Sequence, residues 1–173
     1  MPGEKAERDV AESFFEELYG DAVTGDHSLV LWSPETKRTL WATSPGGAAA
    51  EVDRIGSTTD LYFGVALQSK TEALKLRQAK DEHDGRAPST SLAYTRGYIQ
   101  SAVAIPGLWL DVDVAGDGHE KRGLPTSVEQ AWLILKSLPH PPTLQVKTGG
   151  GFHAYWLFKE PWVFDGAEER DKA

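Results

Sequence analysis

An apolar stretch at residues 107–114, GLWLDVDV, carries two aspartates one residue apart. Its alternating pattern predicts a β-strand, in which successive side chains point to opposite faces. Asp111 and Asp113 then share one face with Trp109, and the aliphatic side chains at 108, 110, 112 and 114 point the other way. Aspartate is disfavoured in strands, and two facing carboxylates repel each other. The pair therefore indicates chemistry more than folding.

Two residues of strand separate the Cα atoms of Asp111 and Asp113 by roughly 6.6 Å. At that spacing both carboxylates reach one divalent cation, or a pair of cations about 3.5–4 Å apart. The alternative interpretation is a strand end with two solvated aspartates.

The composition is that of an ordinary globular protein. With 173 residues the chain is long enough to bury one core, so a single domain spanning 1–173 is expected. The absence of cysteine excludes disulfides and thiolate metal sites and fits a reducing compartment. No segment resembles a membrane span or a secretory signal, which predicts a cytoplasmic protein with no membrane partner. A net charge of −8 argues against a protein that mainly coats nucleic acid.

Hydrophobic periodicity along the chain predicts both helices and strands, and hence an α+β fold. Helical spacing is found at 5–19, 71–82 and 126–138, and β-type segments at 28–32, 38–42, 60–67, 143–147 and 152–158. Segment 46–55 fits neither pattern, and 83–94 is typical of a loop. At the start of the third helix, Thr126 and Glu129 fit a capping box.

Three consecutive glycines, Gly149, Gly150 and Gly151, join the last two predicted strands into a hairpin. Glycine tolerates positive φ and has no side chain to block an anion, so successive N–H groups there can form a phosphate nest. Thr148 adds a hydroxyl donor and Lys147 adds charge. The alternative is a flexible turn without a ligand.

His153 lies two residues beyond the glycines, on the strand face that also carries Tyr155. This position places its imidazole within reach of a phosphate oxygen, although an exposed histidine without a role fits the same pattern. A carboxylate pair and an anion-cradling turn about 40 residues later are together the two halves of a metal-nucleotide site.

These residues resemble the archaeo-eukaryotic primase superfamily, and within it the bifunctional primase-polymerase domain of plasmids, phages and mobile elements. The resemblance covers roughly residues 14–161. Its strongest parts are LWLDVD at 108–113 and TGGGFHAYWLFKEP at 148–161, which is similar to the family's Ser-Gly-x-Gly-x-His-x-Tyr-Trp segment. Thr148 replaces the commoner serine and keeps the hydroxyl. Weaker similarities are FFEELYG near the start, DLYFGVAL, and the Arg96–Gly97 pair.

The resemblance implies an RRM-like antiparallel or mixed sheet packed with helices as the catalytic core. Asp111 and Asp113 would hold Mg²⁺ or Mn²⁺, and His153 would contact the phosphates of the incoming nucleotide, with Thr148 and the three glycines helping. Lys147 and Arg96 would add nucleotide or template contacts, and His119 would be an accessory ligand. The implied activity is templated nucleotidyl transfer, with nucleoside triphosphates and a DNA template and primer as partners, and a helicase or further domains in the full-length protein.

One departure from the family concerns its third acidic residue, which lies on a later strand. The only late aspartates here are Asp165 and Asp171, neither in a strand-like setting, and AEERDKA is typical of the start of a helix. We therefore expect the third carboxylate to be missing and the chain to be a C-terminally truncated fragment that binds metal and nucleotide but polymerises poorly or not at all. Two alternatives stay open: a catalytically silent nucleotide- or nucleic-acid-binding module of a replication initiator, and a metal-dependent nuclease.

Overall fold

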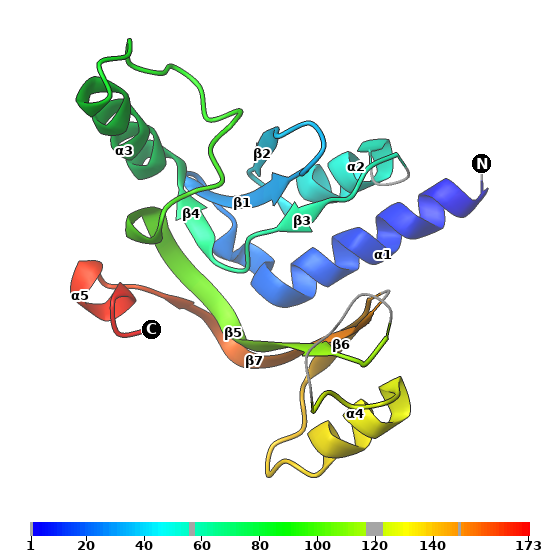
Figure 1. The fold of residues 1–173 in the computed structure, drawn as a ribbon. Coiled ribbons are helices and arrows are strands. Elements are labelled where there is room, and N and C mark those ends of the chain that lie inside the picture. Colours follow the sequence, from blue (N-terminus) through cyan, green and yellow to red (C-terminus); the bar gives the residue numbers. More distant parts are fainter. Residues whose placement is uncertain (1, 56–57, 117–122, 149) are drawn as a thin grey trace. The chain divides into compact units, whose positions relative to one another are not determined.

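The computed structural model describes residues 2–55, 58–116, 123–148 and 150–173, and side chains from residue 8 onward. It confirms an α+β fold (Figure 1). In chain order the elements are α1 (Pro2–Tyr19), the 3-10 turn η1 (Gly20–Ala22), β1 (His27–Trp32), β2 (Thr39–Ala42), α2 (Pro45–Ile55), β3 (Tyr62–Phe63), β4 (Leu67–Ser69), α3 (Lys70–His83), η2 (Ile99–Ser101), β5 (Ala102–Asp113), α4 (Val128–Lys136), β6 (Leu144–Lys147), β7 (Gly151–Val163) and α5 (Ala167–Arg170).

The strands form one seven-stranded antiparallel sheet in the order β2-β1-β4-β5-β7-β6, with β3 also paired to β1. The chain divides into two compact units, which are described separately below: unit 1 comprises Met1–Pro106 and Pro161–Ala173, and unit 2 comprises Gly107–Glu160. Among the described helices, none combines the length and the apolar character needed to cross a bilayer.

Unit 1 is built on the hairpin of β1 and β2, which the sequence predicts. Val30 pairs with Trp41, and both side chains pack against Ala73 of α3 and against Leu92. Because strand faces alternate, Leu31 points to the opposite face of β1. The segment 46–55, which fits neither pattern in the sequence, lies in helix α2.

The segment 60–67, expected to be one strand, is instead split into β3 and β4. The backbone N–H of Gly64 donates to the carbonyl of Val30 at 2.8 Å. The carbonyls of Gly64 and Val65 accept from the buried hydroxyl of Tyr19, at 3.2 and 2.8 Å. These contacts satisfy the backbone between the two short strands, so the segment turns there although its side chains favour a strand.

A buried aspartate fixes the loop after α3. Asp81 is 1% exposed and accepts hydrogen bonds from Arg77 and Arg86, at 3.1 and 3.2 Å, and from the backbone N–H and hydroxyl of Ser89. The hydroxyl of Ser89 contributes most to holding the pKa of this carboxyl far below its usual value, and the two arginines add to it.

We expect Asp81→Asn to lower the thermal unfolding midpoint by about 5 °C or more, because it leaves two arginines without their shared carboxylate. A lowered pKa means that this stabilisation is present at neutral pH and is lost as pH falls below the ordinary pKa of aspartate. Thermal unfolding at pH 7 and at acid pH measures both effects. Asp84→Asn is the matched control, because the exposed carboxylate of Asp84 pairs with Arg86 at the surface rather than in the core. Equal midpoints for the two variants would contradict the assigned role of Asp81.

Unit 2 contains the end of β5, helix α4, and the hairpin of β6 and β7. Ala131 and Leu135 of α4 pack on Phe152 and Ala154 of β7, and the half-buried side chains that join this core are Val112, Val114, Val128, Trp132 and Trp156. The predicted helix is confirmed but its cap is one residue later than expected. Ser127, not Thr126, is the N-cap, and its hydroxyl accepts from the N–H of Gln130. Thr126 instead bonds the Gln130 side chain through its hydroxyl and its backbone N–H.

Candidate functional site

The end of β5 and the start of β7 bring the principal predicted site residues together on one face of the sheet in unit 2. Val112 lies in the core under α4, together with Phe152 and Ala154. The two-residue alternation of a strand therefore turns Asp111 and His153 to the opposite face. Their side chains meet there: Nε2 of His153 lies 3.5 Å from Oδ1 of Asp111.

Tyr155 extends this cluster by one more contact. Its hydroxyl lies 3.4 Å from Nδ1 of His153, and the two rings meet edge to face at 6.4 Å. A neutral imidazole with its hydrogen on Nε2 satisfies both neighbours, since Nδ1 then accepts from the tyrosine and Nε2–H points to the carboxylate. The imidazole is thus oriented from both sides.

Tyr155 is 2% exposed, and burial raises its pKa to about 12, with the nearby charge of Asp111 adding to the rise. We expect Asp111→Asn to move this pKa back toward the ordinary value of 10.0. Glu129→Gln, on the α4 side of unit 2, leaves it unchanged. Absorbance titration of the phenolate above pH 9 measures the pKa. An unchanged Tyr155 pKa in Asp111→Asn would show that the Asp111 carboxylate does not lie near the Tyr155 hydroxyl.

The same raised pKa has a consequence for stability. Because the folded protein holds the Tyr155 proton more tightly than the unfolded chain, its contribution is present below pH 10 and is lost as pH rises toward 12.

Asp113 follows Asp111 by two residues in β5, which places both carboxylates on one face. Asp113 is half-buried, whereas the side chain of Asp111 is 65% exposed. Mg²⁺ commonly takes one or two carboxylates and completes its octahedral shell with waters and substrate phosphates. Two aspartates on one strand face, the first of them exposed, fit that donor set. In the described part of the chain, no three His, Asp or Glu side chains cluster closely enough to hold a metal by themselves.

The glycine turn has a structural role that the sequence interpretation did not include. A Cβ atom on Gly151 would lie 1.9 Å from the carbonyl oxygen of Val112, so β5 occupies the space that the missing side chain leaves. The carbonyl of Gly150 accepts from Val114 N–H, and the carbonyl of Gly151 accepts from Thr148 N–H, each at 2.9 Å. The first hydrogen bond holds the turn to the end of β5, and the second closes the turn itself. Phosphate binding by the glycine turn stays a prediction. Gly149 lies outside the described residues.

Lys147 lies on the other side of the hairpin from His153. It pairs with Phe152 across β6 and β7, and it lines a cavity of about 380 Å³ together with Glu129 and Trp132 of α4. The structure therefore does not place Lys147 beside the carboxylates.

Arg96 belongs to unit 1, where its guanidinium stacks over the ring of Trp32 at 4.4 Å. Its role in nucleotide binding stays a prediction. Asp165 and Asp171 also belong to unit 1, the first after β7 and the second at the end of α5, so the expected late helix is present. His119 lies outside the described residues.

Two aromatic residues join this face without having been assigned a site role from the sequence. Tyr155 orients His153, and Trp109 shares the strand face of Asp111 and is half exposed. Both could have been found from the two-residue repeat of a strand, because each lies two residues from a predicted site residue and so shares its face.

No protein-family model matches the chain, and neither a curated protein nor a solved structure matches it at a significant level. The resemblance to the primase superfamily therefore rests on the sequence motifs, chiefly those at 108–113 and 148–161.

Proposed function

We propose that this chain is the catalytic domain of a DNA primase-polymerase on an RRM-like core, which joins nucleotides to a 3′-hydroxyl under direction of a DNA template. The observation that carries the proposal is the 3.5 Å contact between Asp111 and His153. These two residues belong to separate motifs more than 40 positions apart, and both motifs occur in the family's order.

Each residue has a chemical task in this proposal. The carboxylates of Asp111 and Asp113 supply hard oxygen ligands for Mg²⁺ or Mn²⁺. When bound, the cation lowers the pKa of the attacking hydroxyl and neutralises charge on the α-phosphate and the leaving pyrophosphate. The Nε2–H of His153, which points to Asp111 in the ligand-free chain, would instead be donated to a phosphate oxygen of the incoming nucleotide when the Asp111 carboxylate holds the cation, and Tyr155 keeps the imidazole oriented for that contact.

The spacing of these groups suits a substrate that is both anionic and bound to metal. The His153 donor stands beside Asp111, so a triphosphate that reaches the imidazole also reaches a cation held by the carboxylate. Thr148 begins the turn that precedes His153, and its half-buried side chain offers a further hydroxyl donor.

Primer extension tests the proposal directly. A labelled primer on a DNA template is incubated with the chain, all four nucleoside triphosphates, and Mn²⁺ or Mg²⁺. We expect the primer to lengthen slowly with release of pyrophosphate, and extension to disappear in the Asp111→Asn and Asp113→Asn variants. A shortened primer would overturn the proposal in favour of a nuclease. Metal-dependent nucleotide binding without any extension would overturn it in favour of a silent binding module.

A further inference from the structure

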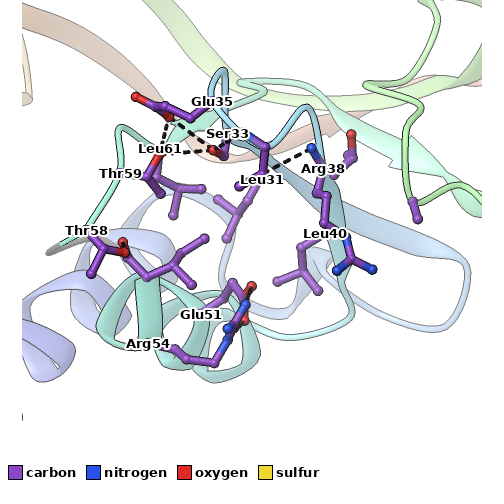
Figure 2. A pocket seen from close by; sticks show the side chains of 14 residues that line it. Leu31, Ser33, Glu35, Arg38, Leu40, Glu51, Arg54, Thr58, Thr59 and Leu61 are labelled. Carbon is purple, nitrogen blue, oxygen red and sulfur yellow. Dashed lines mark hydrogen bonds and ion pairs between the residues drawn. The ribbon is translucent and has the colours of Figure 1, made fainter.

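Unit 1 contains a cavity of about 630 Å³ that the proposed function does not use (Figure 2). It opens between the β1–β2 hairpin, helix α2 and the segment that precedes β3. Its volume lies within the range of small-molecule sites, which runs from about 300 to 1,000 Å³. Apolar side chains form part of its wall: Leu31, Leu40, Ile55 and Leu61.

One side of this cavity carries negative charge. Glu35 accepts hydrogen bonds from the hydroxyls of Ser33, at 3.2 Å, and of Thr59, and the three side chains gather together in Figure 2. The hydrogen bond from Thr59 contributes most to lowering the pKa of Glu35, so this group is a carboxylate at neutral pH. It is an acceptor for donor groups of a ligand.

The opposite side carries net positive charge. Glu51 and Arg54 lie there in Figure 2, with the guanidinium of Arg54 forked onto the carboxylate of Glu51. Arg38 is close enough to Glu51 to help lower the pKa of that carboxyl. Two guanidiniums and one carboxylate leave this side with one positive charge. Among the described residues, no hydrogen bond or ion pair holds the guanidinium of Arg38.

We propose that this cavity binds a nucleoside monophosphate without a metal ion, with the phosphate on Arg38, the base between the leucines, and an amino group of the base on Glu35. A nucleotide has a group for each of the three parts of this cavity: the arginine side, the apolar wall and the Glu35 side. Its phosphate is an anion for a guanidinium, the faces of its base are apolar, and the base edge carries donors. This second site is independent of the proposed polymerase activity, because all of its lining residues lie in unit 1.

Isothermal titration of the full chain with adenosine monophosphate in EDTA tests the inference, because EDTA removes any metal-dependent binding at Asp111 and Asp113. We expect measurable binding to the wild type and to Asp111→Asn. Arg38→Ala weakens it at least about 10-fold, the loss typical of a charge-assisted phosphate contact. Arg38 is exposed, so its replacement leaves the fold intact. Lys37→Ala is the matched control with unchanged affinity, since Lys37 lies over the Trp32 ring outside the cavity.

A comparison of two nucleotides tests whether Glu35 contacts the base. Uridine monophosphate lacks the amino group of adenine, so we expect it to bind more weakly than adenosine monophosphate to the wild type, and Glu35→Gln to reduce the difference. Three results would overturn the proposal: no binding at millimolar nucleotide, equal loss in Lys37→Ala and Arg38→Ala, or inorganic phosphate binding as tightly as the nucleotide. Loss of binding in Asp111→Asn would assign the nucleotide to the carboxylate face instead.

Discussion

Asp111→Asn is expected to lower Mn²⁺-dependent nucleotide affinity by about 100-fold or more. Even residues that only support a metal ligand cost 10- to 100-fold when they are removed, and Asp111 is proposed as a ligand itself. Asparagine keeps the size of the side chain and removes the charge. Because the side chain of Asp111 is 65% exposed, the substitution leaves the core of unit 2 unchanged. Titration of a nucleoside triphosphate in the presence and in the absence of Mn²⁺ measures the effect.

Glu160→Gln is the matched control for this prediction. It removes one negative charge from the same unit, on a strand face opposite to His153 by the alternation of β7. We expect its metal-dependent affinity to equal that of the wild type. A loss of similar size in both variants would attribute the effect to net charge rather than to a metal site at Asp111.

Gly151→Ala is expected to destabilise unit 2 by about 3 kcal/mol or more, at the upper end of the cost of overpacking. The new methyl group would lie 1.9 Å from the Val112 carbonyl oxygen and 3.0 Å from its carbon. Both are backbone atoms, which cannot rotate away as a flexible side chain does. The strands β5 and β7 must therefore separate, and the contact between Asp111 and His153 separates with them. Urea unfolding followed by tryptophan fluorescence measures the change in the free energy of unfolding.

Hydrogen exchange locates the damage caused by Gly151→Ala. The N–H of Val114 donates to Gly150 at 2.9 Å, so we expect this amide to exchange faster in the variant. Gly116→Ala is the control, because a Cβ atom at Gly116 meets nothing within 4 Å. Wild-type stability and exchange in Gly151→Ala would show that the Val112 carbonyl does not lie against Gly151.

Local patterns in the sequence are sufficient to predict most of the regular elements. The β1–β2 hairpin, helices α1, α3 and α4, and the final hairpin are found where hydrophobic periodicity places them. The segment 60–67 shows the limit of such reasoning, because its interruption depends on the hydroxyl of Tyr19, more than 40 residues away in the chain. Side-chain propensity carries no information on a long-range hydrogen bond.

The candidate site shows the same division between local and long-range effects. Alternation within a strand correctly places Asp111 away from the core, and His153 and Tyr155 on a shared face. It does not reveal which strand faces the glycine turn. The role of Gly151 in admitting the Val112 carbonyl, and the position of Lys147 beside α4, both depend on strand pairing and are visible only in the folded chain.

Paramagnetic broadening of the histidine side-chain signals reports whether Mn²⁺ binds beside Asp111 and His153. Mn²⁺ is added in substoichiometric amounts to the chain with a nucleoside triphosphate, and the imidazole resonances are followed by NMR. We expect His153 to broaden first, because it lies beside Asp111, and the exposed His140 in the same unit to be unaffected at that concentration. Equal broadening of His153 and His140, or broadening of His153 that persists in the Asp111→Asn/Asp113→Asn double variant, would contradict this expectation.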